Sequence, residues 1–102
     1  MKLIEMLCEM VDEEIEDAEK YAKCALKYKA DNPALSKTFY DLSTDELRHM
    51  MLLHGEVTGA IQKYRQEHGE PPAEMKAIYD YLHEKQIKKA AEVKRLQEMY
   101  RE

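Results

Sequence analysis

Hydrophobic residues along most of the chain recur every three or four positions, which is the period of an amphipathic helix. Two breaks interrupt this pattern, at Ala30-Asp31-Asn32-Pro33 and at Gly69-Glu70-Pro71-Pro72. Asp and Asn are favoured as caps before a Pro that opens a helix, and Gly is favoured where a helix ends. The pattern therefore predicts three long helices, over residues 2–29, 33–68 and 72–101, in a single domain of residues 1–102.

The composition favours an all-α protein. The 102 residues include only 3 Gly and 3 Pro, too few for the frequent turns of a β-sandwich or barrel. Short connections make neighbouring helices antiparallel, so we expect a long antiparallel helical hairpin plus a third long helix. A chain this small buries only about 65% of its unfolded surface on its own, and we therefore expect a homo-oligomer, at least a dimer.

Charge and cysteine content exclude several function classes. The chain has 21 acidic residues against 16 Lys and Arg, a net charge of −5, whereas a general nucleic-acid binder carries the opposite sign. No apolar run reaches the ~20 residues of a membrane span, and no signal-peptide cleavage site follows the N-terminus, so we expect a cytoplasmic protein. Cys8 and Cys24 lie too far apart on one helix to bridge, and they form no C-x-x-C motif for a zinc ribbon or rubredoxin-type centre.

Polar residues interrupt the apolar stripes of the predicted helices. Glu46 and His49 fall within the stripe of helix 33–68, one helical turn apart. Glu14 falls within the stripe of helix 2–29, whereas Glu13 and Glu16 lie outside it. The stripes comprise Leu3, Leu7, Val11, Ala18, Tyr21, Ala25 and Tyr28 in the first helix, Leu35, Phe39, Leu42, Leu53, Val57, Ala60 and Tyr64 in the second, and Met75, Ile78, Leu82, Val93, Leu96 and Tyr100 in the third, where Lys85 and Lys89 interrupt it.

The predicted hairpin places three of these polar residues at the same level along its long axis. Glu14 lies about 17 residues before the turn, and Glu46 and His49 lie about 15 and 18 residues after it, which makes them level within roughly 5 Å. Two buried carboxylates cost several kcal/mol per ion unless compensated. A metal ion compensates directly, and protonation or pairing with Lys85 or Lys89 does so more weakly.

The donor types favour iron or manganese over structural zinc, because they are carboxylate oxygen and imidazole nitrogen without thiolate. Dinuclear sites in helical bundles use a Glu from each of two helices and a Glu-x-x-His from each of the other two. This chain offers half of that set, and a two-fold dimer would complete it. The alternative to a metal site is a purely structural role, in which a buried Glu–His hydrogen bond orients a dimer.

The pattern Glu14-x6-Tyr21 followed by Glu46-Leu47-Arg48-His49 resembles the ferritin-like di-iron carboxylate proteins. The segments EEIEDAEKYAK and TDELRHMML, within residues 10–60, are most similar to the encapsulated ferritins and to half of a rubrerythrin. The resemblance implies a ferritin-like four-helix core completed by homodimerisation. It implies metal ligation by Glu14, Glu46 and His49, with Glu46 as the bridge and Tyr21 near a ligand carboxylate. The implied activity is oxidation of ferrous iron by dioxygen or peroxide, with two iron ions per dimer and manganese as the other candidate.

The chain departs from these families in three ways. It ends in QEMYRE, which continues the helical pattern, and this argues against docking to a shell protein. It lacks the four-cysteine iron centre of rubrerythrins, and helix 72–101 contains no Glu-x-x-His. Whether Glu84 or Glu92 of that helix joins the site stays open. The alternative function is a metal-free acidic helical dimer that acts as an interaction module.

Overall fold

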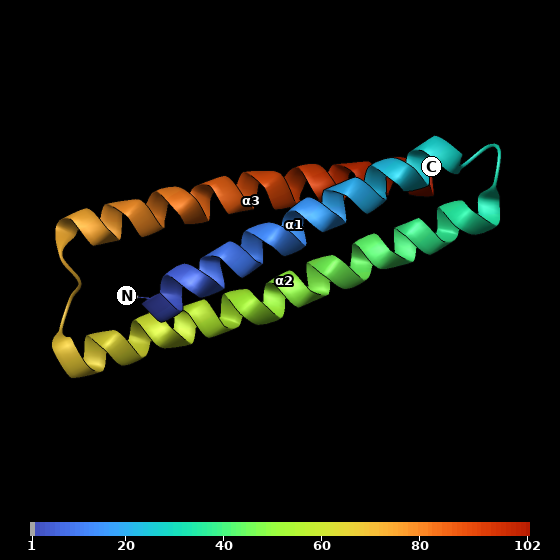
Figure 1. Ribbon diagram of the computed structural model, residues 1–102. Coiled ribbons are helices and arrows are strands. Elements are labelled where there is room, and N and C mark those ends of the chain that lie inside the picture. The colour runs from blue at the N-terminus through green and yellow to red at the C-terminus, as the bar shows by residue number, and fades with distance from the viewer. Residues whose placement is uncertain (1) are drawn as a thin grey trace.

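The computed structural model describes residues 2–102, which form three helices and no strand (Figure 1). Helix α1 spans Lys2–Tyr28, α2 spans Pro33–His68 and α3 spans Ala73–Arg101. The all-α class is confirmed, and each predicted helix end lies within one residue of the observed one. The molecule is a rod of 55 × 18 × 18 Å. Within residues 2–102, none of the helices contains an apolar segment that could span a lipid bilayer.

The two breaks in the hydrophobic pattern end the helices as their residue types predict. The side chain of Asn32 caps α2 by accepting a hydrogen bond from the Leu35 N–H at 3.2 Å, and Pro33 occupies the first turn. Gly69 ends α2 with φ of 77°, a left-handed conformation that favours glycine. Its N–H donates to the Arg65 carbonyl at 2.8 Å. Capping chemistry therefore sets both ends of α2.

Helices α1 and α2 form an antiparallel hairpin and pack against each other along its length (Figure 1). The surface on which α1 and α2 meet is the seam. Near the turn the seam is lined by small residues. The Ser43 hydroxyl donates to the Ala18 carbonyl at 2.7 Å, and the Ser36 hydroxyl donates to the Ala25 carbonyl. Because these hydroxyls bond across the seam, they are buried without the cost of a lost hydrogen bond. Farther from the turn the seam is aliphatic, with Ile4, Leu7, Val11, Ile15, Leu47 and Val57 buried.

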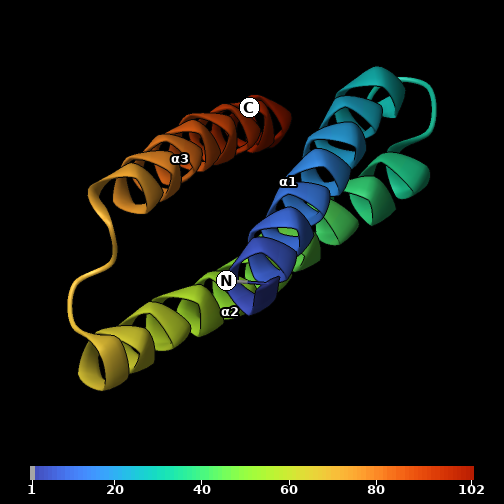
Figure 2. The ribbon, with the colours of Figure 1, turned by 60° about the vertical axis from the view of Figure 1, so that its left-hand side comes forward.

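Helix α3 packs chiefly against α1, runs parallel to it and touches α2 at few places (Figure 2). Its buried apolar residues are Val93 and Leu96. The other buried anchors are polar: Gln97 donates to the Ser43 hydroxyl at 2.9 Å and Gln86 donates to the Asp12 carboxylate at 3.0 Å. The attachment of α3 is thus more polar and less continuous than the seam.

The predicted stripes are wrong in phase at several positions. Leu3 and Ile78 are 57% and 58% exposed, whereas Ile4 and Ile15 are 1% exposed. Ala22, which was not in the predicted stripe, is also buried. Leu7, Val11, Ala18 and Ala25 of the stripe predicted for α1 are buried, whereas Leu3 of the same stripe is exposed. The buried face of α1 is therefore rotated from the predicted stripe toward Ile4, Ile15 and Ala22. Lys85 and Lys89 are exposed on α3.

Candidate metal centre

The structure brings Glu14, Glu46 and His49 together at mid-height of the hairpin. Glu14 comes from the middle of α1, and Glu46 and His49 come from adjacent turns of α2. One ligand atom from each side chain lies within 4.8 Å of the others, and within residues 2–102 this is the one group of three or more His, Cys, Asp or Glu side chains that converges so closely. The level placement predicted from the hairpin register is therefore observed.

The distances within the cluster suit shared coordination better than direct hydrogen bonding. His49 Nδ1 lies 3.7 Å from Glu14 Oε2 and 3.8 Å from Glu46 Oε2. Both separations exceed the length of an N–H···O hydrogen bond. The Glu–His hydrogen bond of the structural alternative is therefore not formed. Two ligands that each lie about 2.1 Å from a common ion are roughly 3 to 4 Å apart. The observed separations fall within that range.

One oxygen of the cluster is buried without a partner. Glu14 Oε2 is inaccessible to solvent and makes no hydrogen bond with the described residues. Leaving a buried acceptor unsatisfied costs about 1–3 kcal/mol, and more for a charged group. A cation bound between Glu14, Glu46 and His49 would remove that cost. The residues present therefore fit a metal ion in both donor chemistry and unmet coordination.

The cluster lies at the edge of the seam, on the side away from α3. Asp12 contacts Gln86 of α3, and Glu14 is two residues farther along α1, so the two side chains point about 200° apart. Tyr40 stacks on Tyr100 of α3 at 4.5 Å, and His49 lies nine residues beyond Tyr40, about 180° around α2. The cluster consequently faces the surface of the hairpin that α3 leaves uncovered.

The position at the seam edge differs from the core position that the stripes predicted. The side chains of Glu14, Glu46 and His49 are 26%, 18% and 42% exposed. The difference follows from the phase of the seam, because Ile15 and Leu47, the chain neighbours of Glu14 and Glu46, are buried in it and the cluster lies at its flank. Among the neighbouring acids of α1, Glu14 belongs to the cluster, whereas Glu13 and Glu16 are exposed and lie outside it. The choice of Glu14 as the ligand from α1 stays a prediction.

The remaining candidates lie elsewhere. The ring of Tyr21 stacks on Phe39 at 6.2 Å and is two helical turns from Glu14, so its role near a ligand carboxylate stays a prediction. On α3, Glu92 pairs with Arg95 at 2.7 Å and Glu84 lies 3.6 Å from Lys88. Neither acid joins the converging group within residues 2–102. The open question about α3 is thereby answered for a single copy of the chain.

The sequence interpretation missed a row of exposed apolar side chains that leads to the cluster. Leu3, Met6 and Met10 are 57%, 49% and 39% exposed. Met10 precedes Glu14 by four residues, Met6 precedes Met10 by four, and Leu3 precedes Met10 by seven. Residues at these spacings share one helix face. The same spacing rule would have identified the row had exposed positions been sought as well as core positions.

Comparison of the chain with protein-family models, with curated proteins and with solved structures finds no match. The resemblance to ferritin-like proteins therefore rests on the motif residues themselves.

Proposed function

We propose that this chain forms a homodimer with a ferritin-like four-helix core that binds two iron ions and oxidises ferrous iron with dioxygen or peroxide. The ligands are Glu14, Glu46 and His49 of each copy. The observation that carries the proposal is their convergence around the unpartnered, buried Glu14 Oε2. Manganese suits the same donors.

The number of ligands supports a shared site. Three donors from one chain leave an iron or manganese ion short of the higher coordination that these metals take with oxygen and nitrogen ligands. His49 is 42% exposed, so the cluster is accessible to groups from a second molecule. A two-fold axis beside the cluster would add the same three residues from the partner, which gives the set used by dinuclear bundle sites.

The surface around the cluster supports a second copy as the source of those ligands. The exposed row of Leu3, Met6 and Met10 runs up to Glu14 along α1. On α2, the half-buried Leu42 and Leu53 lie one turn either side of Glu46 and His49. Exposed apolar patches beside a polar centre are typical of interaction surfaces. Dimerisation through this face would cover the apolar row and close the cluster together.

The proposed chemistry treats ferrous iron as the substrate. Each ferrous ion gives up one electron, so a pair reduces one peroxide molecule, with two protons, to two molecules of water. The anionic oxygens of Glu14 and Glu46 stabilise the more highly charged ferric product, because an opposite charge within a few ångströms interacts more strongly as its partner's charge rises. His49 adds a neutral donor that fixes the geometry at each ion.

Metal analysis combined with solution mass tests the proposal. The purified full chain is stripped with chelator, loaded anaerobically with ferrous ion and measured for metal content and molecular mass. We expect about one iron per chain in a dimer or larger assembly, and faster ferrous oxidation on adding peroxide than in buffer alone. A monomer that keeps two tightly bound ions would contradict the shared site. A dimer that binds no metal would favour the interaction-module alternative.

A further inference from the structure

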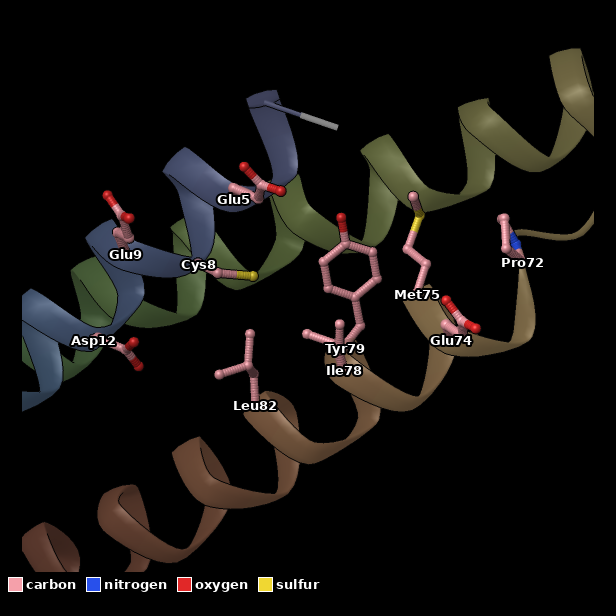
Figure 3. Close-up of a pocket in the computed structure, with 10 residues that line it drawn as sticks. All are labelled: Glu5, Cys8, Glu9, Asp12, Pro72, Glu74, Met75, Ile78, Tyr79 and Leu82. Carbon is pink, nitrogen blue, oxygen red and sulfur yellow. The ribbon is translucent and has the colours of Figure 1, made fainter.

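A second acidic region lies on the opposite side of α1, in a groove between the first halves of α1 and α3. The groove encloses about 560 Å³, which is within the range of about 300–1,000 Å³ typical of small-molecule sites. Met75, Ile78 and Leu82 of α3 and Cys8 of α1 form its apolar floor. Figure 3 shows Leu82 directed from α3 toward α1, with Cys8 directed back from α1.

Within residues 2–102, the charged side chains that line this groove are acidic. Glu5, Glu9 and Asp12 follow one another on one face of α1, and Glu74 stands at the start of α3 (Figure 3). The ten lining residues that the structure describes include four carboxylates and no Lys, Arg or His. The groove thus combines an apolar floor with an acidic rim, and Lys85 and Lys89 line the neighbouring hollow that shares Asp12 and Leu82 with it.

The carboxylates of the rim affect the pKa values of the Cys8 thiol and the Tyr79 hydroxyl, which line the groove. Burial, and after it the charge of Asp12, raises the pKa of the Cys8 thiol. Burial, and after it the charge of Glu5, raises the pKa of the Tyr79 hydroxyl. In both cases the nearby carboxylate opposes the appearance of another negative charge. An anionic ligand would meet the same opposition, and a cationic ligand would be attracted.

The arrangement of the acids does not suit a bare metal ion. Unlike Glu14, Glu46 and His49, the rim carboxylates surround the floor and form no converging group of ligand atoms within residues 2–102. Asp12 also accepts a hydrogen bond from Gln86 at 3.0 Å. An ion would sit over apolar side chains with its hydration unreplaced, which is unfavourable. The chemistry of the groove therefore calls for a ligand that is itself part apolar and part cationic.

We propose that this groove binds an amphipathic organic cation, with its apolar body on Met75, Ile78 and Leu82 and its ammonium group among the rim carboxylates. The burial of the apolar body supplies affinity in proportion to the area covered. The carboxylates supply charge selectivity, and the ring of Tyr79, which lines the same groove, adds a π surface that attracts organic ammonium groups.

Octyltrimethylammonium, used below its micellar concentration, is the probe that tests this. Binding to the full chain is measured by calorimetry and by the methyl resonances of Ile78 and Leu82. Octyl sulfate carries the same chain with the opposite charge, and tetramethylammonium carries the head group alone. We expect the octyl cation to shift the methyl resonances and to bind at least about tenfold more tightly than either control, because each control lacks one of the two contributions. Equal binding of octyl sulfate would overturn the charge selectivity.

Variants separate the rim from the floor. Glu9 and Glu74 are exposed, so Glu9→Gln with Glu74→Gln should fold normally and weaken the octyl cation on the order of tenfold. The matched control is Glu56→Gln with Glu98→Gln, which removes two exposed acids outside the groove and should leave affinity unchanged. Leu82→Gln should weaken the octyl cation and leave tetramethylammonium unaffected.

Two results would overturn the proposal. If the Glu9 and Glu74 double variant binds the octyl cation as tightly as the wild type, the rim plays no part in recognition. If the octyl cation lowers the solution mass of the protein instead of binding to an unchanged assembly, the groove is a contact between copies of the chain.

Discussion

Helix α1 carries an acidic region on each side, and the two regions differ in what lies between their charges. On one side Glu14 meets Glu46 and His49, and the ligand atoms lie within 4.8 Å of one another. On the other side Glu9 and Asp12 stand at the rim of a groove with an apolar floor. Both regions draw on the same acidic stretch of sequence, so its net charge cannot distinguish them.

The difference shows that side-chain direction, and not the number of acids, determines the ligand that a region suits. Convergent oxygens with a nitrogen donor replace the hydration shell of a metal ion. Dispersed oxygens around apolar side chains leave an ion hydrated but attract a cation with an apolar body. Asp12 and Glu14 are only two residues apart, yet the helix turns them to opposite sides and thus to different chemistry.

Replacement of Glu14 is expected to have the largest effect on this comparison. Glu14→Ala removes the ligand with the unpartnered oxygen, so metal affinity should fall at least about a hundredfold, since loss of mere supporting groups already costs about 10–100-fold. Ferrous oxidation should fall with it. The measurement is metal binding by calorimetry together with the oxidation rate.

Glu16→Ala is the matched control, because Glu16 is exposed on the same helix and lies outside the cluster. It should keep metal affinity near the wild-type value. Affinity of the octyl cation should be unchanged in Glu14→Ala. If Glu16→Ala loses metal and Glu14→Ala retains it, the assignment of the α1 ligand is wrong.

Replacement of Glu46 should separate stability from function. Glu46 is 18% exposed, so Glu46→Leu exchanges a mostly buried charge for an apolar side chain. Such exchanges stabilise by about 1–4 kcal/mol when packing is good. Because Glu46 is partly exposed, we expect a gain of about 1 kcal/mol, at the lower end of this range. In chelator the variant should therefore melt about 4–8 °C above the wild type, and ferrous or manganous ion should raise only the wild-type melting temperature.

Thermal melting at equal protein concentration, with chelator and with metal, checks both parts. A lower melting temperature for Glu46→Leu in chelator would mean that the carboxylate makes a bond that the fold needs. No change in the wild-type melting temperature on adding metal would remove the support for a metal centre.

The helices were predictable because their signals are local. Asn32, Pro33 and Gly69 act through caps formed by residues within one turn, so the helix ends follow from the sequence to within a residue. The seam was less predictable. Its phase depends on Ile4, Ile15 and Ala22, which are buried although they lie beside the predicted stripe. Neighbouring columns of a helix both carry apolar residues here, so the pattern of a single helix does not decide which column faces α2.

The meeting of Glu14, Glu46 and His49 was predictable from register, since level positions on an antiparallel hairpin lie side by side. The exposure of the three side chains was not predictable, because it depends on the phase of the seam. The groove was not anticipated at all. Its position depends on how α3 is held to α1, by Gln86, Val93 and Leu96, beyond the segment from Pro72 to Leu82 that lines the groove. A single-helix pattern carries no information on such spacing.

The smallest expected effect is a shift in the pKa of Cys8, whose side chain lines the groove. Burial and the charge of Asp12 raise the pKa of its thiol above the ordinary value of 9.0. In a Cys24→Ser background Cys8 is the only thiol, and Asp12→Asn should lower its pKa because one of the two causes is removed. The asparagine carbonyl can still accept the hydrogen bond from Gln86. Alkylation of Cys8 should consequently reach its half-maximal rate at lower pH, as measured by mass spectrometry.

The same shift has a definite sign for stability. A thiol whose pKa is raised by folding stabilises the native state below pH 9, and this contribution is lost as pH rises through the folded-state pKa. The loss of stability at alkaline pH should therefore be smaller in Asp12→Asn than in its parent. The control is Asp17→Asn, which changes an exposed acid of α1. It should leave both the pH dependence of Cys8 alkylation and the melting temperature at alkaline pH unaltered. Metal affinity should be the same in all three proteins, because Asp12 points away from Glu14. An equal shift of the Cys8 pKa in Asp17→Asn would mean that this pKa depends on the net charge of α1 and not on Asp12 in particular. The two acidic regions of α1 would then be separate in position but would not be electrostatically independent.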